Sequence, residues 1–186
     1  MSYDALAESV RLLEGAPPAS DARLSRRVRY AALAVDRDGD VAITMFLRRG
    51  VSGQPLLDLH SLELTGGGWR LLGGGGGPGD EALDPRPALA DLPGPAVSLG
   101  GGGTAGSRRG LLGRRRTTWV SWAEFRAAEE VALVRVGDRH VPVAGHGMAV
   151  VVWAGMPPTV TALDASGEEL GRVPLRASSS REYRDP

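Results

Sequence analysis

The sequence predicts a mainly β protein of the α+β class. We expect an N-terminal helix with an antiparallel sheet, followed by a small C-terminal antiparallel immunoglobulin-like β-sandwich. Short apolar runs alternate with turn residues from Thr117 to Leu175, which is typical of antiparallel strands. Asp38-Gly39 separates two further apolar runs, as in a β-hairpin. The 27 Gly and 13 Pro residues leave little room for long helices.

The first element expected is a short amphipathic helix. Gly15 and the following Pro17-Pro18 would end it. Its apolar residues recur at helical spacing, and we expect this stripe to pack on the sheet. They are Tyr3, Leu6, Ala7, Val10 and Leu13.

Antiparallel strands are expected next. Residues 28–35 and 41–47 flank the Asp38-Gly39 turn. Apolar residues change faces near Ser61, which predicts a bulge or a bend. Residues 69–72 would form a short strand that ends where the glycines of 73–77 begin.

The chain is expected to divide into an N-terminal part (1–92), a Gly/Arg-rich linker (93–116), a C-terminal sandwich-like domain (117–176) and a tail (177–186). Prolines and a second glycine run, Gly100 to Gly103, interrupt the linker, with a short strand expected only at 96–99. A helical turn is expected at 123–129. An immunoglobulin-like sandwich needs about 100 residues. The C-terminal part is therefore either a minimal sandwich, which we favour, or is completed by strands from before the linker.

Missing residue types exclude several chemistries. The chain has no Lys and no Cys, so it lacks a P-loop lysine, a Schiff-base amine, a thiolate nucleophile and a cysteine zinc site. Two segments match G-x-G-x-x-G, one starting at Gly74 and one at Gly101. Neither has the strand, turn and helix that a dinucleotide site requires. No cofactor is predicted.

Asp58 and His60 are the weak candidates for catalytic residues, because they project from the same face of one strand. Residues two apart on a strand lie about 7 Å from each other, which is loose for an acid–base dyad. His140 and His146 lack a third ligand with recognisable spacing, so no metal site is predicted. These observations favour a protein that is not an enzyme.

The candidate anion-binding segment contains five arginines close together. Guanidinium groups match phosphate oxygens in geometry and charge. The whole chain carries 22 basic and 22 acidic residues, however, and this balance does not favour nucleic acid as a partner. The candidate residues are Arg108, Arg109, Arg114, Arg115 and Arg116.

We expect a cytoplasmic protein. The N-terminus lacks a basic region followed by an apolar core, so no secretory signal is predicted. The longest apolar run, 148–154, is far shorter than the ~20 residues that span a bilayer, so no membrane association is expected.

Spaced hydrophobic and turn positions carry a resemblance that covers most of the chain except its centre. They are Asp38-Gly39-Asp40 with Ala42, Gly67-Gly68-Trp69-Arg70, Val134 to Val136, Arg139 to Val143, Gly147 and Val152-Trp153. The layout resembles that of uncharacterised actinobacterial proteins with an N-terminal α+β part and a C-terminal β-sandwich-like part. That resemblance implies no known activity. The N-terminal part also resembles the nuclear-transport-factor-2-like cone, which would need a second helix at 21–28.

The leading functional hypothesis is a non-catalytic protein-binding or accessory module that presents loops or an edge strand to another protein. One alternative is a small-molecule binder or enzyme with a pocket in the N-terminal sheet near His60. The other is phosphate or RNA binding through Arg108 to Arg116. The sequence specifies neither the partner nor the oligomeric state.

Overall fold

The computed structural model describes residues 3–109 and 115–175, with side chains for 3–106 and 117–175. The helical elements are α1 (Ala5–Leu13) and the 3₁₀ turns η1 (Asp80–Ala82) and η2 (Leu89–Asp91). The strands are β1 (Tyr30–Asp38), β2 (Val41–Arg49), β3 (Pro55–Thr65), β4 (Gly68–Pro78), β5 (Ala96–Arg109), β6 (Arg115–Ala127), β7 (Leu133–Val136), β8 (Arg139–Pro142), β9 (Met148–Ala154), β10 (Val160–Leu163) and β11 (Glu169–Arg172).

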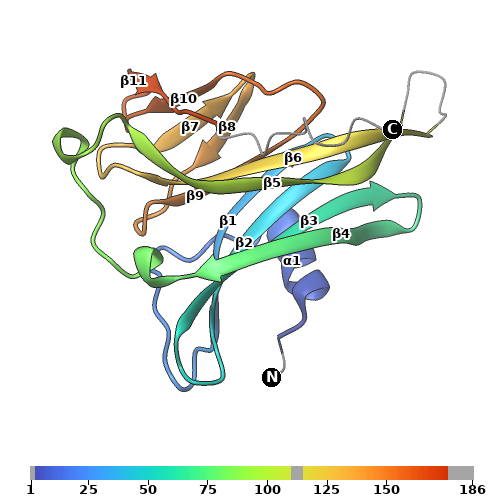
Figure 1. The fold of residues 1–186 in the computed structure, drawn as a ribbon, viewed down its shortest axis with the longest axis horizontal. Helices are drawn as coiled ribbons and strands as arrows, with labels where there is room; N and C mark the ends of the chain where they lie inside the picture. Colours follow the sequence, from blue (N-terminus) through green and yellow to red (C-terminus); the bar gives the residue numbers. More distant parts are fainter. Residues whose placement is uncertain (1–2, 110–114, 176–186) are drawn as a thin grey trace, which may run out of the picture.

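The strands form three antiparallel sheets. Sheet A has the order β1-β2-β3-β4, sheet B the order β5-β6-β9, and sheet C the order β11-β10-β7-β8. Helix α1 covers one face of sheet A, sheet B packs on its other face, and sheet C packs on the far side of sheet B (Figure 1). The prediction of a mainly β protein with one short N-terminal helix and antiparallel sheets is confirmed.

Strand β9 of sheet B is buried on both faces, which explains why its sequence is continuously apolar. Met148, Val150 and Val152 face sheet A. The alternate residues, including Val151 and Trp153, face sheet C. A strand buried on both faces needs no polar alternation, and each fully buried large apolar side chain contributes about 1.5–3 kcal/mol.

Helix α1 is held at its start and on its buried face. The Asp4 carboxylate accepts hydrogen bonds from the amides of Leu6 and Ala7, both at 3.0 Å, which caps the helix. The buried Ser9 hydroxyl lies 2.8 Å from the Thr44 hydroxyl of β2. The predicted helix is confirmed, but its packing face differs from the expected stripe: Ser9 and Leu12 are buried, whereas Ala7 is exposed. Residues 21–28 do not form the second helix that the cone-like layout would need.

The hairpin and the phase change in the N-terminal part are as predicted. Asp38 pairs with Val41 across a tight turn in which Gly39 has a φ of 61°. The β3–β4 register shifts between Ser61 and Leu62, at the expected place, but the extra residue is Leu72 of β4, and β3 keeps a continuous register with β2.

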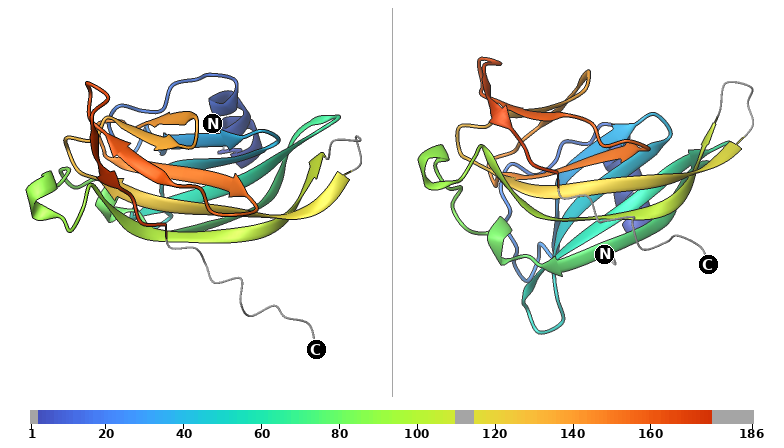
Figure 2. Two further views of the ribbon diagram at one scale, coloured as in Figure 1. Left: turned by 90° about the horizontal axis from the view of Figure 1, so that it is seen from above. Right: turned by 45° about the horizontal axis from the view of Figure 1, so that its top comes forward.

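The predicted linker was wrong over most of its length. Strand β4 continues through the first glycine run, and β5 occupies 96–109 as a full partner of β6 (Figure 2). Glycines carry no side chains, so this strand has no hydrophobic periodicity that could be read in the sequence. Side chains of β6 fill the space beside these glycines, since a Cβ on Gly102 would lie 2.3 Å from the Trp122 ring.

Two further expectations were wrong for related reasons. Most of the helical turn expected at 123–129 is the end of β6, which extends to Ala127, because ladder bonds to two neighbouring strands override the local pattern. The C-terminal part is also not a minimal sandwich. Sheet B takes β5 from before residue 117, and Ala96 of that strand lies in the core shared with sheet C. Strand β5 lies within the predicted linker, so neither alternative anticipated the strand that completes sheet B.

Candidate functional site

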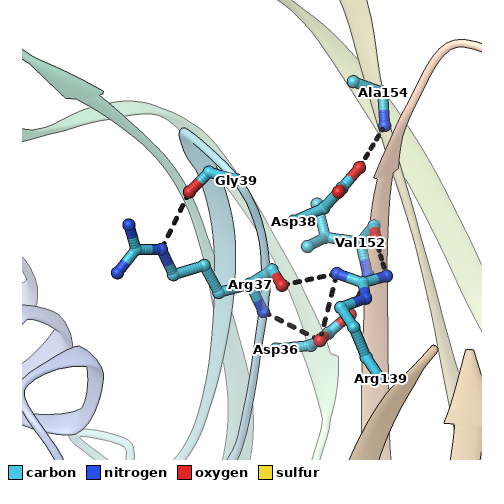
Figure 3. Close-up of polar contacts among 7 residues, drawn as sticks. All are labelled: Asp36, Arg37, Asp38, Gly39, Arg139, Val152 and Ala154. Atoms are coloured by element: carbon cyan, nitrogen blue, oxygen red, sulfur yellow. Dashed lines mark hydrogen bonds and ion pairs between the residues drawn. The ribbon is translucent and has the colours of Figure 1, made fainter.

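The edge where β1 of sheet A meets β9 of sheet B is closed by side chains. Strand β9 is the outer strand of sheet B. The Asp36 carboxylate accepts a hydrogen bond from the Val152 amide at 2.9 Å, and the Asp38 carboxylate accepts one from the Ala154 amide at 3.3 Å (Figure 3). The amides of β9 that point away from sheet B therefore donate to carboxylates of β1. These carboxylates take the place of the carbonyls that a neighbouring strand would offer.

An arginine from sheet C completes this closure. Arg139 of β8 donates to the Val152 carbonyl at 2.9 Å and to the Arg37 carbonyl at 2.5 Å, and pairs with Asp36 at 3.3 Å (Figure 3). Burial raises the pKa of Asp36, and the Arg139 charge opposes that rise. One guanidinium and two carboxylates therefore join all three sheets and protect β9 from pairing with another chain.

The opposite edge of sheet A, strand β4, is open. Residues Gly73 to Gly76 are all exposed. The Gly79 amide donates to the Pro55 carbonyl at 3.1 Å, which sets the alternation of the ladder. Gly73, Gly75 and Gly77 therefore bond to β3, while Gly74 and Gly76 direct their amide and carbonyl groups outward.

Backbone contact explains why these outward residues are glycines. A Cβ on Gly74 would lie 2.4 Å from the carbonyl oxygen of Leu59, and a Cβ on Gly76 would lie 2.4 Å from that of Leu57. Only glycine fits so close to a neighbouring backbone. The geometry that requires glycine also leaves this edge without side chains to protect it.

Strand β5, the other outer strand of sheet B, runs close to β4 (Figure 1). Large side chains of β6 lie against its glycines: Glu124 at Gly100 and Trp122 at Gly102. The Trp122 ring also comes within 4.0 Å of the Cβ position of Gly75 in β4. Trp122 therefore fills the space between the two glycine-rich strands.

Two grooves adjoin the end of β4. The first, of about 530 Å³, is lined by Gln54, Pro55, Leu56, Leu57, Asp58, Gly76, Gly77, Pro78 and Asp80. The second, of about 440 Å³, is lined by Leu57, Gly76, Gly77, Pro78, Asp80, Glu81, Leu99 and Glu124. All the charged residues that line them are acidic. Burial, and then the negative charge of Glu81, raise the pKa of Glu124.

A buried arginine holds the loop that forms one wall of the second groove. Arg126 of β6 is 8% exposed, and its guanidinium donates to the carbonyls of Asp84 at 2.7 Å, Pro85 at 2.6 Å and Glu81. A planar group with several donors can satisfy three carbonyls at once. The positions of Asp80 and Glu81 therefore depend on Arg126.

Known proteins do not identify this edge. No family model, curated protein or solved structure matches the chain. The resemblance to actinobacterial proteins stays a prediction. Within the described ranges, no helix is long and apolar enough to cross a membrane.

The structure places Asp58 and His60 on the face of sheet A covered by α1, but each has its own partner. Asp58 accepts from Arg48 at 2.6 Å, and the His60 Nε2 lies 2.7 Å from the Tyr3 hydroxyl. Burial lowers the pKa of His60 and, together with the Asp58 charge, raises that of Tyr3. Asp58 lines the first groove, whereas His60 lines neither groove. The Asp58–Arg48 bond joins β3 to β2, and the Tyr3–His60 contact holds Tyr3 on the sheet.

Four of the candidate arginines lie at the far end of the paired strands β5 and β6. The ladder places Arg108 opposite Arg116, and Arg109 opposite Arg115. Their side chains, and all of Arg114, lie outside the described residues, so anion binding there stays a prediction.

His140 and His146 have separate environments. His146 is buried, and its Nδ1 accepts the Met148 amide at 3.0 Å. His140 lies on β8. Among the residues that the structure describes, no group of three or more His, Cys, Asp or Glu side chains could hold a metal ion.

Sequence reasoning missed the open edge of β4. One signal could have indicated it. The turn at Gly66 to Gly68 joins two strands, and counting outward from that turn places 73–77 opposite 57–61, as the structure shows. The sequence predicts an end to the strand there, because no side-chain pattern continues through the glycines.

Proposed function

We propose that this protein is a non-catalytic binding module that takes up an extended segment of a partner protein as an additional strand on β4. The observation that carries the proposal is the exposed, outward-facing backbone of Gly74 and Gly76. Addition of a strand to a free sheet edge uses these main-chain groups for affinity.

The contrast between the two edges supports this proposal. At the β9 edge, Asp36, Asp38 and Arg139 occupy the outward groups of the strand. Natural proteins usually block their edges with charged side chains, prolines or bulges. Between the bulge near Ser61 and Pro78, strand β4 carries none of these over its glycine run. A partner strand would meet bare backbone there.

Selection of binders from a displayed peptide library, followed by amide hydrogen exchange, tests the proposal. The bound peptide should slow exchange at Gly74 and Gly76, whose amides face solvent in the free protein. Slowing confined to other elements, or selection that yields no binder, would contradict strand addition at β4.

The peptide itself offers a matched control, because a strand has two edges. Methylating the amides that face β4 should abolish binding, since each methyl group removes a donor and adds bulk at the ladder. Methylating the alternate amides should leave the affinity within about threefold. Equal effects of the two patterns would count against strand addition.

A further inference from the structure

Three unpaired carboxylates border the groove between β4 and β5. They are Asp80 and Glu81, at the η1 turn, and Glu124 of β6. None of the three makes an ion pair with any side chain in the described part of the chain. This face of the open edge is therefore uniformly negative.

Glu124 is the most constrained of these groups. It comes from the middle strand of sheet B, opposite Gly100, and is half-buried. Burial and the Glu81 charge raise its pKa, so its charge lacks compensation in the free protein. A cationic side chain entering the groove would supply that compensation.

An added strand would deliver such side chains to the groove. Its residues alternate between the two faces of sheet A, so every second side chain faces the space between the sheets. Strand β4 has no side chains from Gly73 to Gly77 to obstruct them. Leu57 and Leu99 give the groove an apolar lining, against which the stem of a Lys or Arg side chain can pack while its charged end reaches the acids.

We propose that the segment taken up on β4 is basic, with Lys or Arg at alternate positions that face Glu81 and Glu124. This inference rests on the proposed function and specifies the chemistry of the partner. A second copy of the chain is a poorer occupant of this edge, because paired β4 strands would bring two sets of the same carboxylates together.

Three fluorescent peptides of equal length test the charge requirement by fluorescence anisotropy. They alternate Thr with Lys, Thr with Gln, or Thr with Glu. The Lys peptide should bind at least tenfold more tightly than the Gln peptide, and its affinity should fall as the salt concentration rises. The Glu peptide should not bind. Amide exchange at Gly74 and Gly76 should slow in the Lys complex.

Gly77 offers a matched pair of variants. A Cβ on Gly77 would meet nothing within 4 Å, and this residue lines both grooves. Gly77→Lys places a cation in the groove and should lower the affinity for the Lys peptide at least tenfold. Gly77→Ala adds bulk at the same position without a charge, and should weaken binding of the Lys peptide less than Gly77→Lys does. Glu124→Gln should also weaken binding, with thermal unfolding as a check on its fold.

The outcomes separate the two proposals. Equal affinity for the Lys and Gln peptides, with slowed exchange at Gly74 and Gly76, would overturn the basic partner and keep strand addition. No slowing at β4 with any peptide would overturn strand addition itself. Lys-peptide binding that is indifferent to Gly77→Lys and Glu124→Gln would also overturn the basic partner. Concentration-dependent self-association that protects Gly74 and Gly76 would identify a second copy as the occupant instead.

Discussion

The Asp36 carboxylate accepts the Val152 amide at 2.9 Å, and this bond crosses the boundary between sheets A and B. Asp36 is 6% exposed and also pairs with Arg139. A side chain of sheet A therefore accepts the hydrogen bond that a neighbouring strand would otherwise accept from β9. The contact between β1 and β9 depends on that carboxylate as well as on the apolar core.

Replacing Asp36 should destabilise the fold strongly. Asp36→Ala leaves the Val152 amide and the Arg139 guanidinium without their acceptor, and we expect a loss of about 3 kcal/mol in the free energy of unfolding. Asp36→Asn keeps an acceptor oxygen and should cost less. Urea unfolding measures both. A loss below about 1 kcal/mol for Asp36→Ala would show that the closed edge does not stabilise the fold.

Alanine at the outward glycines of β4 should be tolerated far less than alanine at their neighbour. Gly74→Ala and Gly76→Ala each place a Cβ 2.4 Å from a β3 carbonyl oxygen, so the backbone must shift, at a cost of about 2 kcal/mol or more. Gly77→Ala meets open space and should be neutral or slightly stabilising. Thermal unfolding of the three variants checks this order, and equal stabilities would contradict the close approach of β4 to β3.

Removing the Tyr3 hydroxyl should loosen the start of the chain. Tyr3→Phe keeps the ring that packs edge-on to Phe46, but loses the bond to His60. We expect a loss of about 1 kcal/mol and faster amide exchange in α1 than in sheet C. Exchange in α1 that matches the parent protein would argue that ring packing alone holds the helix.

Acidification should reveal the partial burial of His60. Burial lowers the pKa of His60 below its ordinary 6.5, so the folded protein binds the proton less tightly than the unfolded chain. Stability is therefore lost as pH falls through 6.5 and levels off below the folded-state pKa. His60→Gln should flatten the decline in unfolding free energy between about pH 7 and pH 5. Parallel curves for variant and parent would contradict this.

The wall of the second groove should depend on Arg126. The single nitrogen of lysine in Arg126→Lys cannot satisfy three loop carbonyls, so we expect a loss of about 1–3 kcal/mol and faster amide exchange over residues 80–85. The control is Arg135→Lys, which alters an exposed ion pair with Glu169 and should cost less than about 0.5 kcal/mol. Similar losses for the two variants would mean that the loop does not need the guanidinium.

Sequence patterns predicted the elements whose own side chains carry the information. The helix α1, the Asp38-Gly39 turn, the phase change at Ser61 and the apolar run of β9 each follow from local periodicity or turn chemistry. Asp58 and His60 were correctly placed on one face. Their partners, Arg48 and Tyr3, come from distant positions and could not be read from spacing.

The sequence alone determined a mainly β chain that lacks lysine and cysteine chemistry, because composition, alternation and turn residues are local properties. The tertiary structure decided what the glycine runs do. In β5 the glycines leave room for the Trp122 and Glu124 side chains of the neighbouring strand. In β4 they leave the outward amides of Gly74 and Gly76 exposed. Glycine carries no pattern of its own, so its role is set by the strand that pairs with it.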